Sequence, residues 1–415
     1  MKVGIVGLGY VGLPLAVAFA EAGAQVVGVD IDGDRTEALA RGESDIEDLP
    51  SAQLRAVGDS VSFGVDPAAL AEADAVLICV PTPLTINREP DLAPLLSASK
   101  SVGSIVRAGQ LVVLESTTYP GTTRERLLPA LEASGMTAGE DFHVAFSPER
   151  VDPGSRGYSL RNTPKVVGGL TEACADRAEE LYRMVCDEIV RVSTPEVAEL
   201  SKLLENIFRS VNIALVNELA ILAHRMDIDI WEVVDAAATK PFGFMRFDPG
   251  PGMGGHCLPV DPFYLSWKAR EYDFALEFIE LAGKLNQRMP YVCVQRVIEV
   301  LNTVDKSVHG SDVLLLGVSY KPGVSDTRES PALKIAGLLL EQGAELSYHD
   351  PHVPALAGFD LHSVELGPAV AKADIVVVVT AHPEVDHDAV VRDAALVLDL
   401  RGVTAGDSDS SAVRL

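Results

Sequence analysis

Basic residues are scarce in this sequence. Its 415 residues include 34 Lys and Arg against 60 Asp and Glu, which gives a formal net charge of −26 at pH 7. General binding to nucleic acids or to anionic membranes requires clustered Lys and Arg, so we expect neither kind of partner. A small anionic ligand is compatible with this charge, because a few local cations and backbone N–H groups can hold a phosphate.

Long apolar runs and paired cysteines are also missing. No apolar run approaches the ~18 residues that cross a bilayer. The Gly-rich start of the chain predicts a strand and a turn rather than a signal peptide. The 5 cysteines lie far apart without a CxxC motif, which disfavours a disulfide framework and fits a reducing cytoplasm. The histidines form no HxxxH or HExxH motif, so we expect no metal site.

The composition is that of a soluble globular protein. Apolar residues make up 47% and charged residues 23% of the chain, far from the composition of a disordered segment. At about 150 residues per domain, the length predicts two or three domains.

Residues 1 to about 190 alternate short apolar runs with Ala-, Leu- and Glu-rich helical stretches. Strands are predicted at Lys2–Val6, Gln25–Asp30, Ala75–Val80, Leu111–Glu115 and His143–Phe146. Strands that alternate with helices predict a parallel sheet covered on both faces. The loops that follow such strands at their carboxyl ends are where open α/β sheets bind ligands.

The sequence pattern changes at Pro195. Apolar residues recur at helical spacing, without Gly or Pro, from Glu196 to Arg225, which predicts one helix about 45 Å long. It is apolar on more than one side, as in helices buried between domains or subunits, so we expect a homodimer or a higher oligomer. Further helical pattern fills Ile230–Ala238 and Pro262–Val304.

Strands and helices alternate again in the last part of the chain, from Asp312 onward. The whole predicts an α/β protein in which two Rossmann-like, doubly wound parallel-sheet domains are joined by a long central helix and a helical domain. The expected boundaries are 1–194 for the first sheet domain, 195–305 for the helical domain and 306–415 for the second sheet domain.

A dinucleotide-binding pattern occupies the first turn of the chain. Gly7, Gly9 and Gly12 form a GxGxxG that follows a predicted strand and opens a predicted helix, and Asp30 ends the next strand 18 residues after Gly12. In this pattern the glycines allow a tight turn, a close approach of a pyrophosphate and helix–strand packing. Asp30 is expected to bind the ribose hydroxyls and to repel a 2′-phosphate, so the predicted cofactor is NAD.

Three further residues are included in this cofactor site. Tyr10 and Val11 lie inside the GxGxxG loop. Arg35, in the helix that follows Asp30, either stacks near the ribose or lies on a solvated helix face.

Cys257 lies in the loop with the strongest sequence signal. Four glycines and two prolines fall within residues 249–255, so a tight loop delivers this cysteine to its position. With Asp261 four residues later, Cys257 resembles a presented nucleophile. Lys202 and Asn206 share one face of the long helix, where they form either a functional polar pair or an ordinary salt-bridged or exposed face.

The other cysteines are expected to be small buried hydrophobic residues. They are Cys79, Cys174, Cys186 and Cys293.

Taken together, the motifs resemble the UDP-glucose/GDP-mannose dehydrogenase family over nearly the whole chain. The matching segments are Gly7–Gly12, Ser116-Thr117, Ser147–Arg150, Glu199–Asn206, Gly254–Cys257, Tyr320–Pro322 and Asp326–Ser330. The resemblance implies an NAD-dependent four-electron oxidation of a nucleotide sugar, from the C6 alcohol to the carboxylate. The first sheet domain would bind NAD and the second the UDP-sugar.

Catalytic roles follow from the resemblance. Cys257 would attack the C6 aldehyde, and the thiohemiacetal would lose a second hydride to become a thioester. Lys202, with Asp261 and Asn206, would stabilise the negative charge on the C6 oxygen. Glu149 would be the general base for the water that hydrolyses the thioester, and removal of the first proton is an alternative further role for it.

The remaining positions would bind the two nucleotides. Thr117 would place the water and, like Thr82, lie beside the cofactor, while Arg328 would reach the cofactor phosphates. Lys321 would hold the substrate. The implied substrate-contacting residues are Glu149, Arg150, Lys202, Asn206, Gly254 and Lys321.

The sugar is predicted from the residues around the nucleophile. His256 before Cys257, and Asp261-Pro262-Phe263-Tyr264 after it, resemble the members that oxidise UDP-N-acetylglucosamine. UDP-N-acetylmannosamine and UDP-glucose are the alternatives. Arg246 and Asp248 depart from the pattern expected before the Pro-Gly-Pro-Gly loop, so contacts from that segment are not predicted.

Two other classes of protein compete with this interpretation. Two-electron hydroxyacid-type dehydrogenases share the architecture and a helical Lys and Asn but need no cysteine, and they would form one NADH per substrate. A nucleotide-sensing scaffold could retain the fold without activity, yet the catalytic residue types are all present.

Overall fold

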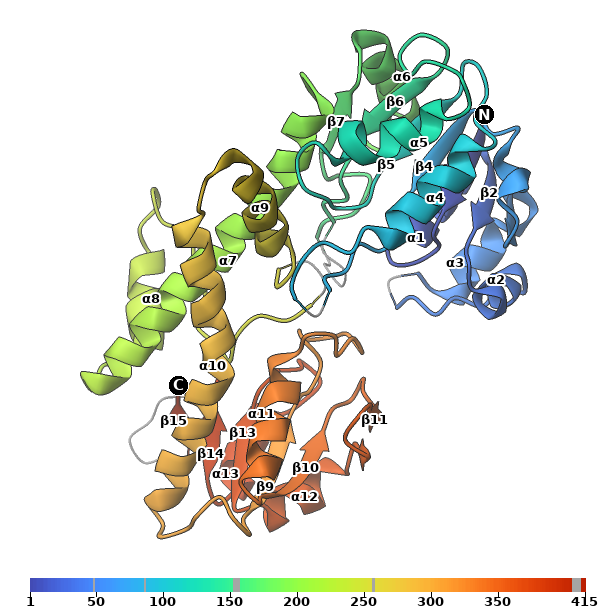
Figure 1. The fold of residues 1–415 in the computed structure, drawn as a ribbon. Helices are drawn as coiled ribbons and strands as arrows, with labels where there is room; N and C mark the ends of the chain where they lie inside the picture. The colour runs from blue at the N-terminus through green and yellow to red at the C-terminus, as the bar shows by residue number, and fades with distance from the viewer. Residues whose placement is uncertain (48, 86, 152–156, 256–257, 405–411) are drawn as a thin grey trace. The chain divides into compact units, whose positions relative to one another are not determined.

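The computed structural model describes residues 1–47, 49–85, 87–151, 157–255, 258–404 and 412–415. These residues form two compact units. The N-terminal unit comprises Met1–Glu205 and Phe263–Phe274, and the C-terminal unit comprises Asn206–Pro262 and Ala275–Leu415. Each unit has its own sheet and its own hydrophobic cores (Figure 1). The expected three-part division at residues 194 and 305 stays a prediction.

The N-terminal unit is built on an eight-stranded sheet with the order β3-β2-β1-β4-β5-β6-β7-β8. Its strands are β1 (Lys2–Val6), β2 (Gln25–Val29), β3 (Val61–Gly64), β4 (Ala75–Ile78), β5 (Leu111–Leu114), β6 (His143–Phe146), β7 (Lys165–Gly169) and β8 (Ile189–Val192). The five strands predicted from the sequence are all present. Every neighbouring pair is parallel except β6 and β7, where Phe146 faces Gly168 in an antiparallel register. The strand order reverses between β1 and β4, where doubly wound sheets bind ligands.

Helices cover both faces of this sheet, as the buried strands require. One core contains Leu77 of β4 with residues of α1 (Gly12–Glu21) and α6 (Glu172–Tyr182). The other contains Val76 and Ile78, the neighbours of Leu77, with residues of α4 (Ala93–Gly103) and α5 (Leu128–Glu132). Adjacent strand residues point to opposite faces, so the apolar run of β4 serves both cores.

Shorter elements complete the N-terminal unit. They are α2 (Gly33–Ala40), α3 (Ser51–Ala56), η1 (Gly58–Ser60), η2 (Pro67–Leu70), η3 (Thr123–Leu127), most of α9 (Asp261–Ala269) and η4 (Arg270–Tyr272). The sequence predicted helix over Pro262–Val304. The structure divides this stretch after α9 and η4, where Asp273 adopts a left-handed backbone with φ +51°.

The C-terminal unit holds a five-stranded parallel sheet with the order β10-β9-β13-β14-β15. Its strands are β9 (Asp312–Leu316), β10 (Glu345–His349), β13 (Ile375–Val378), β14 (Val397–Asp399) and β15 (Ala412–Arg414), and β11 (Ala355–Leu356) pairs with β12 (Leu361–His362). One core packs the sheet against α10 (Glu277–Asn302) and α11 (Pro331–Glu341), and the other against α12 (Leu366–Lys372) and α13 (His387–Asp393). The predicted doubly wound α/β architecture is thereby confirmed.

The long helix α7 runs from Pro195 to Arg225, as predicted. Proline is well tolerated at a first helical position, and the absence of Gly and Pro after it lets the helix continue for 31 residues. A second helix, α8 (Ile230–Ala238), packs against its end through Trp231 and Val234. In Figure 1, α7 crosses α8 and α10.

Helix α7 is also, among the described residues, the one helix long and apolar enough to cross a membrane by length and composition. A single such helix is a weak indication, because core helices meet the same criterion. In α7 two polar side chains bond to other parts of the C-terminal unit. Asn217 donates to Asn286 at 3.1 Å and accepts the N–H of Gly250 at 2.9 Å, while Asn206 donates to Asp261.

The turn between β1 and α1 has the shape predicted for a dinucleotide loop. Gly7 has φ +90°, and its N–H donates to the carbonyl of Val29 at 2.8 Å. A Cβ on Gly12 would lie 1.9 Å from the Gly7 carbonyl oxygen, whereas a Cβ on Gly9 would meet nothing within 4 Å. Gly12 is therefore required by packing inside the protein. The space beside Gly9 is open to a ligand, and the loop fits NAD.

This difference predicts opposite behaviour for two variants. Gly12→Ala should lower the free energy of unfolding by about 1–3 kcal/mol, because the added methyl overlaps the backbone of the turn. Gly9→Ala should leave the thermal midpoint unchanged but weaken NAD binding about tenfold or more, which is about 1.4 kcal/mol. Calorimetry of unfolding and of NAD binding tests both. A Gly9→Ala variant that binds NAD like the parent protein would contradict the assignment.

Candidate active site

Polar side chains gather at the carboxyl ends of β4, β5 and β6. Thr82 follows β4, Thr117 follows β5 and Glu149 follows β6, as the sequence predicted. The buried Thr82 hydroxyl donates to the carbonyl of Thr117 at 2.7 Å, and the Tyr264 hydroxyl donates to the Thr82 carbonyl at 2.8 Å. These bonds fix two loops that border the switch point of the sheet.

Asp30 and Arg35 are placed beside the dinucleotide loop. The Asp30 carboxylate accepts the N–H of Leu8 at 2.7 Å and that of Asp32 at 3.1 Å. It therefore holds the loop, in addition to the ribose contact predicted for it. The Arg35 guanidinium forms an ion pair with Asp45. Tyr10 is 40% exposed, at the surface of the same loop.

Glu149 is held by its own backbone and by a buried lysine. Its Oε1 accepts the N–H of Arg150 at 2.8 Å and that of Val151 at 2.7 Å, and its Oε2 lies 3.4 Å from Lys165 Nζ. Burial works to raise the pKa of Glu149. The charge of Lys165, these two N–H groups and the charge of Lys202 outweigh burial and leave the pKa below its ordinary value. Glu149 is thus an ionised carboxylate in a protected place.

Lys165 is a site residue that the sequence did not reveal. It opens β7, its side chain is only 3% exposed, and its Nζ lies 2.8 Å from Glu115 Oε2. Tyr182 of α6 donates its hydroxyl to the other oxygen of Glu115. Burial raises the pKa of Glu115 despite these partners. In the sequence Lys165 stands alone before an apolar strand, so no local pattern marks it.

The beginning of α7 is tied to the loop after Thr117. Glu199 accepts the N–H of Gly121 at 2.5 Å and that of Thr123 at 2.8 Å. Burial raises its pKa to about 7, against these hydrogen bonds. Lys202 follows one turn later and is half-buried. Arg150, predicted to contact the substrate, forms an ion pair with Glu205 of the same helix at 2.7 Å.

In the C-terminal unit, Asn206 and Asp261 form a buried polar pair. Asn206 Nδ2 donates to Asp261 Oδ2 at 2.5 Å, and both residues are buried. The sequence left open whether Asn206 lies on an exposed face, and its burial against a carboxylate removes that alternative for this residue.

The glycine loop before the predicted nucleophile packs against a second predicted segment. A Cβ on Gly254 would lie 2.7 Å from Tyr320 Cβ, and the Gly255 N–H donates to the Arg328 carbonyl at 3.0 Å. Lys321 lies next to Tyr320, with its Nζ 5.6 Å from that ring. The Arg328 side chain forms an ion pair with Asp326 at 2.6 Å. The loop and the Lys321–Arg328 segment therefore meet within one unit.

Cys257 and His256 lie outside the described residues. The remaining cysteines are buried and unpaired, as predicted. Burial raises the pKa of Cys186 to about 11 and that of Cys293 to about 12. Such thiols are poor nucleophiles, because the thiolate is the reactive form.

A second carboxylate, which the sequence did not reveal, holds the corresponding turn in the C-terminal unit. Asp350 follows β10 as Asp30 follows β2, and it accepts the N–H groups of Val318 at 2.7 Å and Ser319 at 3.1 Å. His382 Nε2 lies 3.0 Å from the same oxygen. Burial works to raise the pKa of Asp350, but these partners lower it to about 2. The position of Asp350 directly after a strand, like that of Asp30, was the sequence signal that could have identified it.

His352, His382 and Glu384 place possible metal-binding atoms within 4.8 Å of one another. His382 already uses both ring nitrogens, since Nδ1 accepts the Gly323 N–H at 3.2 Å and Nε2 faces Asp350. A metal ion would have to displace these bonds, so we assign no metal site to this group.

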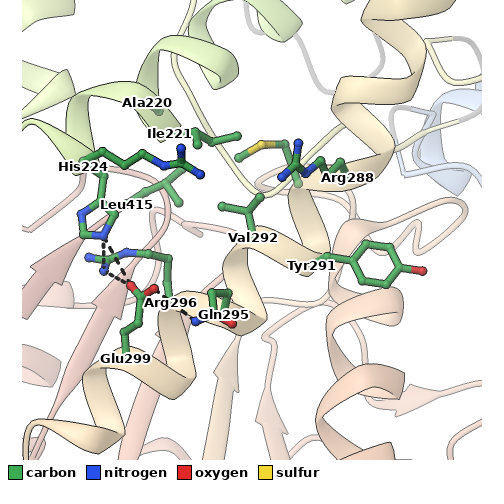
Figure 2. Close-up of a pocket in the computed structure, with 12 residues that line it drawn as sticks. Ala220, Ile221, His224, Arg288, Tyr291, Val292, Gln295, Arg296, Glu299 and Leu415 are labelled. Carbon is green, nitrogen blue, oxygen red and sulfur yellow. Dashed lines mark hydrogen bonds and ion pairs between the residues drawn. The ribbon is translucent and has the colours of Figure 1, made fainter.

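Figure 2 shows a cavity of about 230 Å³ between α7 and α10 of the C-terminal unit. On one wall, Arg296 Nη1 lies 2.8 Å from His224 Nε2 and donates to Glu299 at 2.6 Å. The residues that line this cavity include none of the predicted site residues.

Family models match the chain in three successive parts. The NAD binding domain of the UDP-glucose/GDP-mannose dehydrogenase family matches residues 1–186, its central domain residues 196–288 and its UDP binding domain residues 314–406. The order agrees with the structure, in which the first sheet carries the dinucleotide loop.

Named relatives of several specificities are similar over most of their length. A UDP-N-acetyl-D-glucosamine 6-dehydrogenase of Pseudomonas aeruginosa is 38% identical over 86% of this chain and 84% of its own. A UDP-N-acetyl-D-mannosamine dehydrogenase of Pyrococcus horikoshii is 38% identical over 92% of this chain and 90% of its own.

Solved structures agree with these matches. That of the UDP-D-ManNAc dehydrogenase of Pyrococcus horikoshii has a TM-score of 0.90 at 33% identity and covers 100% of this chain and 99% of that one. A UDP-glucose dehydrogenase of Pyrobaculum islandicum has a TM-score of 0.87 at 31% identity, over 97% and 94% of the two chains. Matches of this extent show that the chain belongs to the UDP-glucose/GDP-mannose dehydrogenase family and is an NAD-dependent nucleotide-sugar dehydrogenase.

Proposed function

We propose that this enzyme oxidises the C6 alcohol of UDP-N-acetylglucosamine to the carboxylate. The similar proteins named above are dehydrogenases of UDP-N-acetylglucosamine, UDP-N-acetylmannosamine and UDP-glucose, so their names alone do not decide the sugar. The proposal adds the residues around the nucleophile, His256 and Asp261-Pro262-Phe263-Tyr264, which resemble the glucosamine-specific members.

The reaction removes four electrons in two hydride transfers. One alcohol, two NAD⁺ and one water give one carboxylate, two NADH and three protons. NAD supplies the hydride acceptor for both steps. After the first transfer, the Cys257 thiolate bonds to the aldehyde carbon as a thiohemiacetal, which keeps the reactive carbonyl on the protein. The second transfer leaves a thioester, and water then cleaves its C–S bond and restores the thiol.

Lys202 is proposed to stabilise the negative C6 oxygen that forms in each step. A fixed ammonium next to a developing oxyanion lowers the barrier, because it needs no rearrangement at the moment of reaction. Asp261 is proposed to assist, held in place by Asn206 at 2.5 Å. A cation near the nucleophile also favours the thiolate over the thiol.

Glu149 is proposed as the base that takes a proton from the attacking water. The observation that carries this role is its place at the edge of the sheet: the Glu149 carboxylate is 19% exposed, lies beside the strand end that bears Thr117, and has a pKa below its ordinary value. A base must be unprotonated at working pH and must lie near the reacting water. Thr117 is proposed to place that water.

The stoichiometry of NADH tests the four-electron reaction. With limiting UDP-N-acetylglucosamine, we expect two NADH per sugar and a carboxylate product, measured by absorbance and by mass spectrometry. Cys257→Ala should form no carboxylate, because the thioester cannot form. The matched control Cys293→Ala removes a buried cysteine whose pKa burial raises to about 12 and should keep the stoichiometry.

One NADH per sugar, with a carbonyl product and full activity in Cys257→Ala, would favour the two-electron class instead. The same assay with UDP-N-acetylmannosamine and UDP-glucose tests the sugar. A kcat/KM higher for either of them than for UDP-N-acetylglucosamine would contradict the proposed specificity.

We also propose that the enzyme is at least a homodimer that works in the cytoplasm. Apolar side chains 42–63% exposed follow one another along α7 at intervals of three, four or seven residues: Val197, Leu200, Leu204, Phe208, Leu215, Leu219 and Leu222. An exposed apolar stripe of this length is typical of an interface. A cytoplasmic location agrees with the unpaired cysteines.

A charge placed in the stripe tests the assembly. Leu219→Glu should lower the molar mass measured by light scattering to that of one chain, because the interface would bury an unpaired carboxylate. The control Glu341→Lys, exposed at the end of α11 and outside the stripe, should leave the mass unchanged. A parent protein that is monomeric at micromolar concentration would contradict the proposal.

A further inference from the structure

Two carboxylates and one ammonium meet at the carboxyl edge of the N-terminal sheet, where Glu149 is 19% exposed and the other two groups are buried. Glu115 follows β5, Glu149 follows β6 and Lys165 opens β7. The side-chain exposures of Glu115 and Lys165 are 0% and 3%. Buried charges are costly unless they are paired and hydrogen-bonded. A site that retains two buried charges, Glu115 and Lys165, next to the proposed base Glu149 calls for a functional reason.

The two contacts of Lys165 differ in kind. Its Nζ lies 2.8 Å from Glu115 Oε2, a normal distance for a charged hydrogen bond. It lies 3.4 Å from Glu149 Oε2, too far for a strong one. Lys165 is thus anchored on Glu115, and it acts on Glu149 chiefly through its charge. The Glu149 Oε2 atom retains lone pairs for a proton.

Glu115 is in turn held by Tyr182, on the carboxylate oxygen that does not face Lys165. The Tyr182 hydroxyl donates to its Oε1, and the Lys165 ammonium lies 5.2 Å from the centre of the Tyr182 ring. On Glu149, the two backbone N–H groups occupy Oε1. Tyr182 of α6 therefore holds Glu115 after β5, Glu115 holds Lys165 of β7, and Lys165 faces Glu149 after β6. This chain of contacts orients the Oε2 atom of Glu149.

We propose that Lys165, anchored by Glu115 and Tyr182, is a positioning residue that keeps Glu149 ionised and aims its Oε2 at the water of thioester hydrolysis. This inference rests on the proposed role of Glu149 and adds how the chain makes that role possible. Among the described residues, the charge of Lys202 of α7 also lowers the pKa of Glu149. The charge of Glu149 in turn raises the pKa of Cys79 after β4 and of Cys186 after α6. Of the two lysines, Lys165 exerts the larger effect on its pKa.

Removal of the Lys165 charge tests the proposal through the pH profile. Without the ammonium, the ionised form of Glu149 loses its main stabilisation, so its pKa rises. In Lys165→Met the acidic limb of kcat should move up by about one pH unit or more, which is about a tenfold loss on that limb, with recovery at higher pH and little change in KM. Lys165→Arg keeps the charge and should restore most of the profile. Lys100→Met, exposed on α4, is the matched control.

Lys165→Met alone leaves Glu115 buried without its cation, so the variant is also made together with Glu115→Gln, which keeps an acceptor for Tyr182. Infrared difference spectra between each variant and the same variant carrying Glu149→Gln report the titration of Glu149 without turnover. A higher pKa in both Lys165→Met backgrounds supports the proposal. A Glu149 titration and an acidic limb identical to those of the parent protein would overturn it. If Glu149→Gln instead turns over normally, the proposed function of Glu149 fails, whatever the titration shows.

Discussion

The carboxyl ends of parallel strands meet at one edge of a sheet, and in this enzyme that edge must hold charges away from water. Lys165 makes this possible in the N-terminal unit. Its ammonium compensates Glu115 at 2.8 Å and Glu149 at 3.4 Å, so that a carboxylate can stay ionised inside the fold. Without that cation, burial would favour a protonated Glu149, and the protein would lose its proposed base.

The two sheets use a similar arrangement of carboxylates at their first turns. Asp30 after β2 accepts the N–H of Leu8, and Asp350 after β10 accepts those of Val318 and Ser319. In each unit, the second strand fixes the loop that follows the first. A loop fixed in this way is ready to receive a phosphate or a ribose without a further loss of conformational entropy.

The sequence predicted those elements that depend on residues close together along the chain. Helix α7 begins at Pro195 and ends at Arg225, as expected, because its apolar spacing is long and uninterrupted. The dinucleotide loop was also predicted, since each glycine has a local reason: a positive φ at Gly7, open space for a ligand beside Gly9, and close backbone packing at Gly12. Lys165 was not predicted, because its partner Glu115 lies 50 residues away along the chain and only β-sheet pairing joins them. The antiparallel entry of β7, which brings Lys165 to Glu149, likewise has no local signature.

In the proposed mechanism, the oxidised sugar stays bonded to the protein until water, activated by Glu149, releases it. The most direct test is mass spectrometry of the Glu149→Gln enzyme, quenched after it has reacted with UDP-N-acetylglucosamine and NAD in the presence of an aldehyde trap. We expect a sugar adduct on the peptide that contains Cys257 and no trapped aldehyde. Trapped aldehyde in solution, with an unmodified Cys257 peptide, would contradict it.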